Sequence, residues 1–372
     1  MEENMYNKSR LVASTLSLPA RYVKGVMEID EEKAEKILKD AYRNGIRYFM
    51  AATQYLMGKC EEFVGRTLKD VRSNISLSTN YRFFDPDLPK ENPVIYSLKK
   101  SLEAFQTDYI DCLNFYGHFV KPEELREAQK AKETGIIRHI AIILDPHMLY
   151  NAKDMIEKAS PVVDTVIAFC SPTNHDHMKI LTELKRDGIR IIAGAPPYIG
   201  SESMPGNIPD IDRSIENISA TEIAVRYFLK QEVFDDVIFI LKEKEYLELM
   251  CECERSMDKY TTGQLEPYFR KEAAISGKPA IICSGCGYCL PCPKGIDITK
   301  LFNIYAYYEQ YGMHDCALHS FINYRERLGG CIDSICVNCG ICEKRCPQRT
   351  SIGANLRELE KFMESLSMSM AL

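Results

Sequence analysis

The sequence predicts a (β/α)8 barrel, an α/β fold, over residues 1–262, followed by a small α+β domain over residues 263–372. Eight short apolar runs alternate with helical patterns across the first part, which has the usual length of such a barrel, about 250 residues. The second part is rich in cysteine, because ten of the chain's fifteen cysteines lie after residue 280. A chain of 372 residues suits one large and one small domain.

The barrel prediction rests on one pattern that recurs along the chain. Apolar residues recur at helical spacing from Ala34 to Tyr42, Gly45 follows in the place of a C-terminal cap, and Ile46–Met50 reads as an apolar strand. Gly135 and Gly188 end two further helical patterns in the same way, and each is followed by an apolar run. This alternation favours a closed barrel over an open doubly wound sheet.

Several of the predicted strands are apolar throughout, as expected for parallel strands covered on both faces. They are Thr15–Leu18, Ile46–Met50, Ile75–Thr79, Tyr109–Phe115, Arg138–Leu144, Thr165–Phe169, Arg190–Ala193 and Val237–Leu241. The first strand is the weakest prediction, because Leu16 and Leu18 form only a short apolar run before Pro19. Functional side chains of such barrels lie at the C-terminal ends of the strands, a region called the barrel mouth below.

Eight of the late cysteines form two runs with the spacing of iron–sulfur ligands. The runs read Cys283-x-x-Cys286-x-x-Cys289-x-x-Cys292-Pro293 and Cys336-x-x-Cys339-x-x-Cys342-x-x-x-Cys346-Pro347. In two-cluster ferredoxins, the fourth cysteine of each run ligates the other cluster. The sequence therefore predicts a ferredoxin-like domain with two [4Fe–4S] clusters. Cluster 1 is assigned to Cys283, Cys286, Cys289 and Cys346, and cluster 2 to Cys336, Cys339, Cys342 and Cys292.

Three other interpretations explain the cysteines less well. Two Cys-x-x-Cys units complete a tetrahedral zinc site, so these runs hold more thiols than one zinc ion needs. A redox dithiol needs only one such unit. Disulfides form in oxidising compartments, whereas the acidic start of the chain lacks the apolar segment of a signal peptide. We therefore expect free thiols and a cytoplasmic protein.

Composition disfavours two classes of partner. The net charge of −6 argues against an obligatory nucleic-acid partner. No uncharged apolar stretch approaches the length of about 18 residues that a membrane helix needs. We expect neither nucleic acid nor a membrane as a partner.

The barrel part resembles the aldo/keto reductases. The stretch Asn44-Gly-Ile-Arg-Tyr-Phe-Met-Ala-Ala-Thr-Gln-Tyr55 and the following Glu61-Glu-Phe-Val-Gly65 resemble the second strand and helix of that family. Asp108-Tyr-Ile-Asp111 resembles its fourth strand, and Gly135-x-x-Arg138-His-Ile its fifth. With the cysteine runs, the chain resembles the branch of the family that carries a C-terminal domain with two [4Fe–4S] clusters.

This resemblance implies a carbonyl-reducing site of four residue types, and three of them are changed here. The tyrosine acid corresponds to Tyr55, but the aspartate five residues earlier is Met50, the lysine is Asn80 and the histidine is Tyr116. A phenol has an ordinary pKa near 10, and a nearby ammonium and carboxylate make it labile. Without them, Tyr55 is expected to be a poor proton donor. His118 lies two residues beyond Tyr116 and faces the mouth only if the strand continues that far; we expect a loop histidine instead.

The resemblance also implies an NADPH site, for which the sequence offers little support. The family holds a phosphate after the eighth strand, where Lys242 and Lys244 alternate with glutamates, a pattern more typical of a solvated face. A Ser-Asn pair after the fifth strand is replaced by Leu144-Asp145-Pro146, and the chain contains no Gly-x-Gly-x-x-Gly. NADPH binding is therefore disfavoured, with Lys242 and Lys244 as the candidate phosphate ligands.

Three further groups of residues invite a chemical interpretation. Cys170, at the end of the sixth strand, is expected to be a buried thiol rather than a nucleophile. His175 and His177 flank Asp176 like metal ligands, but a helix N-terminus explains this segment better. Cys316 and Cys331 lie between the two cysteine runs, and their role is left open.

The leading hypothesis is an iron–sulfur oxidoreductase in which two [4Fe–4S] clusters pass electrons to or from a site at the barrel mouth. The candidate site residues there are Tyr55, Asn80, Tyr116 and His118. A ferredoxin, a flavodoxin or a partner redox protein is the expected electron donor or acceptor. The alternatives are NADPH-dependent carbonyl reduction with Tyr55 as the acid, and a non-catalytic electron-transfer or scaffold subunit.

Overall fold

The structure is a computed structural model. It describes residues 9–370 except 24–25, 54, 84, 86, 118, 145, 160–161, 171–174, 195–219, 266–288, 312–320, 323 and 347–349. The chain divides into two compact units, with a boundary between Thr262 and Gly263. Each unit is described by itself.

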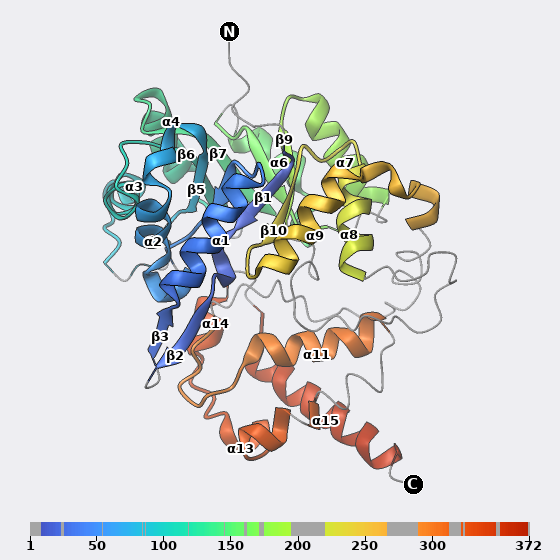
Figure 1. Ribbon diagram of the computed structural model, residues 1–372. Coiled ribbons are helices and arrows are strands. Elements are labelled where there is room, and N and C mark those ends of the chain that lie inside the picture. Colours follow the sequence, from blue (N-terminus) through green and yellow to red (C-terminus); the bar gives the residue numbers. More distant parts are fainter. Residues whose placement is uncertain are drawn as a thin grey trace. The chain divides into compact units, whose positions relative to one another are not determined.

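The first unit is a closed barrel of eight parallel strands (Figure 1). The strands follow one another around the barrel in chain order, and the last pairs with the first. They are β1 (Leu11–Ser14), β4 (Tyr48–Met50), β5 (Ser76–Asn80), β6 (Ile110–Tyr116), β7 (Ile137–Leu144), β8 (Thr165–Ala168), β9 (Arg190–Ala193) and β10 (Asp236–Ile240). The predicted (β/α)8 barrel is confirmed.

The first predicted strand was wrong by several residues. β1 runs from Leu11 to Ser14, with all four residues buried, whereas Thr15–Ser17 forms a 3-10 helix, η1. The apolar residues Leu11, Val12 and Ala13 belong to β1, which pairs with β10 and β4. The first barrel strand is therefore formed by this apolar run and not by the run that contains Leu16 and Leu18. A separate two-stranded antiparallel sheet, β2 (Ala20–Val23) and β3 (Val26–Ile29), follows before the first helix.

Helices connect the strands and lie outside the barrel (Figure 1). α1 (Glu31–Arg43) begins after Asp30, whose side chain accepts a hydrogen bond from the Lys33 N–H, and it ends before Gly45 at a φ of +95°. Its buried face is the predicted apolar stripe. The other helices of the unit are α2 (Cys60–Thr67), α3 (Pro93–Phe105), α4 (Pro122–Glu133), α5 (Pro146–Leu149), α6 (Ala152–Ala159), α7 (His175–Arg186), α8 (Ala220–Lys230) and α9 (Lys244–Arg255), with the 3-10 helices η2 (Tyr55–Gly58), η3 (Lys69–Asn74) and η4 (Met257–Lys259).

Gly65 sets the distance between α2 and α3. A Cβ atom at Gly65 would lie 2.3 Å from the carbonyl oxygen of Phe105 and 2.4 Å from its Cα, and backbone atoms cannot turn aside as a side chain can. Gly65→Ala is therefore expected to lower the free energy of unfolding by about 1–3 kcal/mol or more, measured by urea denaturation. Gly263→Ala is the control, because nothing lies within 4 Å of its Cβ position; an equal loss for both variants would contradict the argument.

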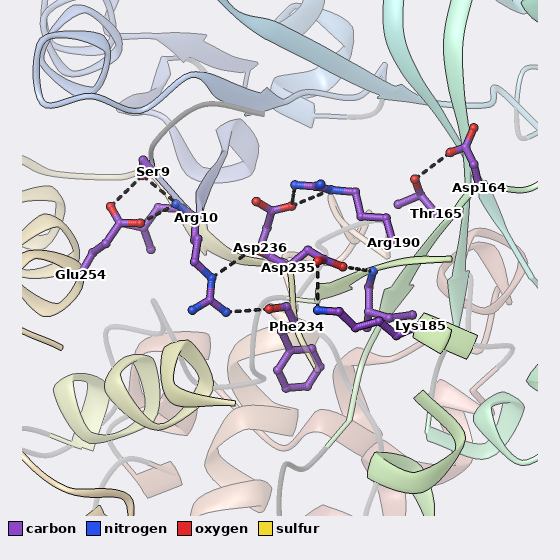
Figure 2. A network of polar contacts seen from close by, with 12 residues as sticks. Ser9, Arg10, Asp164, Thr165, Lys185, Arg190, Phe234, Asp235, Asp236 and Glu254 are labelled. Atoms are coloured by element: carbon purple, nitrogen blue, oxygen red, sulfur yellow. Dashed lines mark hydrogen bonds and ion pairs between the residues drawn. The ribbon is translucent and has the colours of Figure 1, made fainter. Parts of the chain in front are cut away.

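Charged side chains gather at the N-terminal ends of the strands (Figure 2). Arg10, just before β1, donates to the backbone oxygens of Phe234 and Asp235 at 2.6 and 3.1 Å, just before β10. Arg190 at the start of β9 pairs with Asp236 at the start of β10. Lys185 reaches Asp235 at 3.0 Å. Since this end of a barrel serves stability rather than catalysis, we interpret the network as structural.

A second group at the same end surrounds Asp111 in β6. Its carboxylate is 2% exposed and pairs with Arg72 and Arg138, each at 2.9 Å, while accepting the Leu77 N–H at 2.9 Å. Both guanidinium groups also stack on the ring of Tyr109, at 3.8 and 4.1 Å from its centre. One buried carboxylate thus connects β5, β6 and β7.

The described part of the second unit is helical. Its helices include α11 (Ile298–Tyr311), α13 (Ile332–Ile335), α14 (Ile341–Arg345) and α15 (Ile352–Met370). Its core contains Cys289 and buried residues of α11, α13 and α15, and Cys292, Cys336, Cys342 and Cys346 pack against that core. The described residues of this unit contain no strand, so the β part of the predicted α+β fold is not found among them. None of the helices in the described ranges is long and apolar enough to span a membrane.

Candidate functional site

The barrel mouth carries no ionised side chain at its strand ends. The last residues of the eight strands are Ser14, Met50, Asn80, Tyr116, Leu144, Ala168, Ala193 and Ile240. The interior below them is a cluster of mostly apolar side chains that includes Met50 and Ile143, with Tyr116 and Phe169 packed against it. These eight terminal residues thus contrast with the charged side chains at the N-terminal strand ends.

Two of the predicted site residues are brought together at the mouth. The Asn80 amide donates to the Tyr116 hydroxyl at 3.2 Å, and the Asn114 amide donates to the Asn80 carbonyl at 3.1 Å. Asn80 lies opposite Asn114 in the β5–β6 pairing, and both amides are fully buried. Since neutral groups satisfy one another here, Asn80 supplies no charge where the resemblance implies a lysine.

The other two predicted site residues are Tyr55 and His118. Tyr55 begins η2 and is 5% exposed, so its ring is almost enclosed. His118 lies outside the described residues. Around Tyr116 the ring of Phe83 packs edge-on at 5.5 Å, and Phe83 stacks on Phe119 at 4.4 Å. The surroundings of Tyr116 are thus aromatic.

Sequence reasoning missed a buried ion pair beside the mouth. The Glu61 carboxylate in α2 is 1% exposed in its side chain and accepts from the Thr79 hydroxyl at 2.5 Å and from Arg82 Nη2 at 2.5 Å. Arg82 also contacts the hydroxyl of Ser101 in α3. Thr79 and Asn80 are successive residues of β5, so their side chains point to opposite faces of the strand. The Thr79 side chain therefore points outward, toward α2. The available signal was Glu61 itself, a carboxylate between the buried residues Cys60 and Phe63.

The five barrel cysteines are buried thiols. Burial raises the pKa of Cys60, Cys170 and Cys253 to about 12 and that of Cys251 to about 11, and it also raises the pKa of Cys112. Cys170 is 6% exposed, at the mouth end of β8. These thiols have the environment of structural cysteines rather than nucleophiles.

Cys170 is therefore expected to resist alkylation in the folded protein. With a pKa of about 12, about one thiol in ten thousand is ionised at pH 8, and the fraction rises tenfold per pH unit until the pKa is reached. Peptide mapping after iodoacetamide treatment between pH 7 and 9 should show slow modification that accelerates with pH. The unfolded protein is the control, and rapid, pH-independent labelling of Cys170 in the folded state would contradict the burial argument.

The candidate phosphate ligands do not form a cationic site. Lys244 pairs with Glu248 at 3.3 Å along α9, with both side chains exposed. Lys242 lies 3.7 Å from Glu243 and over the ring of Tyr246. Glu243 is the N-cap residue of α9, so a negative charge already occupies the helix end that would attract a phosphate.

The histidine pair is also separated. His175 is exposed in the first turn of α7, whereas His177 is 3% exposed and packs against the ring of Tyr150 at 4.8 Å. This arrangement supports a helix N-terminus rather than a metal site.

In the second unit, one cavity brings cysteines from both runs together. Its walls include Cys289 and Cys292 from the first run and Cys336, Cys339 and Cys342 from the second. Four of these five thiols are those assigned to cluster 2, and the fifth, Cys289, is assigned to cluster 1. The cavity measures about 30 Å³. The thiols around it include the four ligands that a [4Fe–4S] cluster needs, by number and by donor type.

The loop that carries Cys336, Cys339 and Cys342 is anchored to α15. Asn338, at a φ of +55°, accepts from Arg357 Nη1 at 3.1 Å, and Glu343 accepts from the Gly353 N–H at 2.8 Å. Gly353 lets the loop approach, because a Cβ there would lie 2.8 Å from the Asn338 side-chain oxygen. These contacts hold the loop in position, and Asn338, Glu343 and Gly353 themselves line the cavity.

Four cysteines of the second unit remain: Cys283, Cys286, Cys316 and Cys331. Cys283, Cys286 and Cys316 lie outside the described residues. Cys331 lies close to the carboxylates of Glu360 and Glu364. Arg325 contacts the Cys331 sulfur at 2.6 Å and Glu364 at 2.9 Å, so a guanidinium already supplies the positive charge of this group. The thiol belongs to an ion-pair cluster.

Comparisons with known proteins identify the family of the barrel. The sequence model of the aldo/keto reductase family matches residues 19–200. Over most of its length, the barrel is similar to the aldo/keto reductase family. Aldo-keto reductase AKR11C1 from Bacillus halodurans superposes with a TM-score of 0.51 at 19% identity, over 71% of this chain and 96% of that one. The thermostable aldo-keto reductase Tm1743 gives 0.52 at 17% identity, over 69% and 93%. These likenesses show the fold.

Three curated proteins also match parts of this chain. An uncharacterized oxidoreductase, YqkF of Bacillus subtilis, is 26% identical over 243 residues, covering 56% of this chain and 78% of its own. L-galactose dehydrogenase of Arabidopsis thaliana is 26% identical over 213 residues, covering 54% and 66%. A probable voltage-gated potassium channel subunit beta of the same plant is 30% identical over 121 residues, covering 30% and 36%.

The family match ends at residue 200, before both cysteine runs. The aldo/keto reductase barrel and the cysteine-rich unit are thus separate features of one chain. The family accounts for the fold of the barrel, and the chemistry of the second unit has to be argued from its own residues.

Proposed function

We propose that the protein is an iron–sulfur oxidoreductase in which the aldo/keto reductase barrel works with two [4Fe–4S] clusters in the second unit. The observation that carries this proposal is the cavity lined by Cys292, Cys336, Cys339 and Cys342. Cys292 precedes the other three by more than forty positions in the sequence, yet it lines the same cavity, as the ferredoxin pattern requires. A redox dithiol would not need thiols from both runs, and a single zinc ion would use only four of the five thiols around the cavity.

The ligands of cluster 1 follow from the same pattern. Cys289 is 7% exposed in the core of the second unit, and Cys346 packs against that core. Cys283 and Cys286 complete the proposed set by their spacing. The two clusters would supply one-electron chemistry, with potentials that depend on hydrogen bonds to the sulfurs and on solvent access.

The barrel mouth supports a reaction other than ordinary carbonyl reduction. A tyrosine acid needs a neighbouring cation and carboxylate to lose its proton near neutral pH. The strand ends carry Met50, Asn80 and Tyr116 instead, and Asn80 is occupied by hydrogen bonds to Asn114 and Tyr116. We propose that the mouth, with Tyr55, Asn80, Tyr116 and His118, binds the substrate, and that NADPH is not the electron source.

A redox protein is the proposed source or acceptor of electrons, because the residues that the structure describes after β10 do not favour a phosphate site. The N-cap Glu243 and the Lys244–Glu248 pair oppose a phosphate after β10. A cytoplasmic ferredoxin or flavodoxin has the one-electron chemistry that two cubane clusters require.

Two other functions have specific support. The family fold and the retained Tyr55 favour NADPH-dependent carbonyl reduction. The match to a protein named L-galactose dehydrogenase also favours an oxidoreductase of this kind. The match to a protein named as a probable potassium channel subunit beta favours a binding or regulatory barrel without turnover.

Two measurements on anaerobically purified protein separate these functions. Dithionite is expected to reduce the protein with bleaching near 400 nm and an electron paramagnetic resonance signal of reduced [4Fe–4S] centres, whereas NADPH is expected to give neither saturable binding nor turnover of simple aldehydes. Saturable NADPH binding with aldehyde turnover would contradict the proposal. An ordered organic ligand at the strand ends of the purified protein would count against a barrel without turnover.

A further inference from the structure

We propose that a small acidic electron-carrier protein docks on the face of the second unit formed by the Cys336–Cys342 loop and α14. This inference rests on the proposed function, because the face matters for electron transfer only if cluster 2 is present. It deepens that function by naming the surface and the charge of the partner.

The centre of this face is apolar and exposed. The side chains of Val337 and Ile341 are 57% and 37% exposed, and they flank Cys339 in the sequence. They are two of only four large apolar side chains exposed to this degree in the described parts of the chain. Protein interfaces have an apolar centre of this kind within a polar rim.

The rim of the face is basic. Lys294 lines the same cavity as Val337, and Lys344 and Arg345 follow Ile341 in α14. All three are exposed, and none of them forms an ion pair with another residue that the structure describes. The nearby carboxylate of Glu343 is held by the Gly353 N–H. A local excess of free positive charge on a chain of net charge −6 favours an acidic partner.

The face also carries the most exposed of the proposed ligands of cluster 2. Cys339 is exposed, whereas Cys292, Cys336 and Cys342 are half-buried, so Cys339 is the proposed cluster 2 ligand nearest to a docked protein. Transfer there moves one electron from a reduced carrier to the oxidised cluster: the carrier is oxidised by one electron, the cluster is reduced by one electron, and no bond forms or breaks.

The test is the affinity of the loaded protein for an oxidised acidic flavodoxin, measured by isothermal titration calorimetry at low ionic strength. The double variant Lys344→Glu/Arg345→Glu reverses two charges of the rim, and Val337→Ser removes apolar contact area. The matched control is Lys69→Glu/Lys153→Glu, which makes the same change of charge at exposed positions of the barrel. Iron content is measured for every variant first.

We expect the rim variant to raise the dissociation constant about tenfold or more and to weaken its dependence on salt. Val337→Ser is also expected to raise the constant, and the barrel control to leave it within about twofold. Three results would overturn the docking proposal but leave the proposed function intact. They are an unchanged affinity of the rim variant at full iron content, an equal effect of the barrel control, and no saturable flavodoxin binding by the wild type. A shift from dimer to monomer caused by Val337→Ser would identify a second copy as the occupant and overturn it as well. Absence of clusters in the wild type would overturn the proposed function first.

Discussion

Replacing Cys292 with alanine is expected to remove the same cluster as replacing Cys339. The two residues belong to different cysteine runs, but both line the cavity with Cys336 and Cys342. Each variant should therefore fall from about eight to about four irons per chain, since one cubane is lost and the other stays. The spectrum of the remaining reduced cluster should be the same in both variants, as measured by electron paramagnetic resonance.

The controls for this experiment are chosen from the other cysteines. Cys346→Ala should also leave about four irons, but with the spectrum of the opposite cluster. Cys331→Ala and Cys170→Ala should keep all of the iron, because the first thiol belongs to the Arg325 ion-pair cluster and the second is buried in the barrel. If Cys292→Ala and Cys346→Ala left the same spectrum, the crossed assignment would be wrong.

Replacing Asp111 with alanine is expected to lower the free energy of unfolding of the barrel by about 3 kcal/mol. Removing one partner of a buried ion pair costs roughly 3–5 kcal/mol, and the Asp111 side chain is 2% exposed with two guanidinium partners. We take the lower end because the Arg138 side chain is 47% exposed and regains water. The Leu77 N–H would also lose its acceptor. Chemical denaturation followed by circular dichroism measures the loss.

Asp70→Ala is the matched control, since Asp70 is an exposed aspartate of η3. Its effect should stay within about 0.5 kcal/mol, as for most surface substitutions. Iron content and spectra of Asp111→Ala at low temperature should equal those of the wild type. A loss below about 1 kcal/mol would show that the Arg72–Asp111–Arg138 group contributes little net stability, in which case the N-terminal strand ends would need another account.

The barrel could be predicted because its strands are apolar on both faces and its helices end at glycines such as Gly45 and Gly135. That information is local, so seven of the eight strands were placed to within about two residues of their observed ends. The first strand was misplaced because Leu11–Ser14 is short and lies beside another short apolar run. Only its pairing with β4 and β10 distinguishes it.

The site was less accessible from sequence. The positions of Asn80 and Tyr116 followed from family resemblance, but their hydrogen bond depends on the register of β5 against β6. The Glu61–Arg82 pair was missed for a similar reason, because its partners meet only when α2 packs beside the end of β5. The basic rim around Val337 and Ile341 was likewise not foreseen, since spacing identifies cluster ligands without showing which neighbours face the solvent.

Iron and acid-labile sulfide, counted on the same anaerobically purified and fully folded sample, test the central claim most directly. Two [4Fe–4S] clusters predict about eight irons and about eight sulfides per chain, with no bound zinc. Four irons or fewer in a folded sample would contradict two clusters. Zinc with no sulfide would show that the thiols around the cavity hold a structural ion instead.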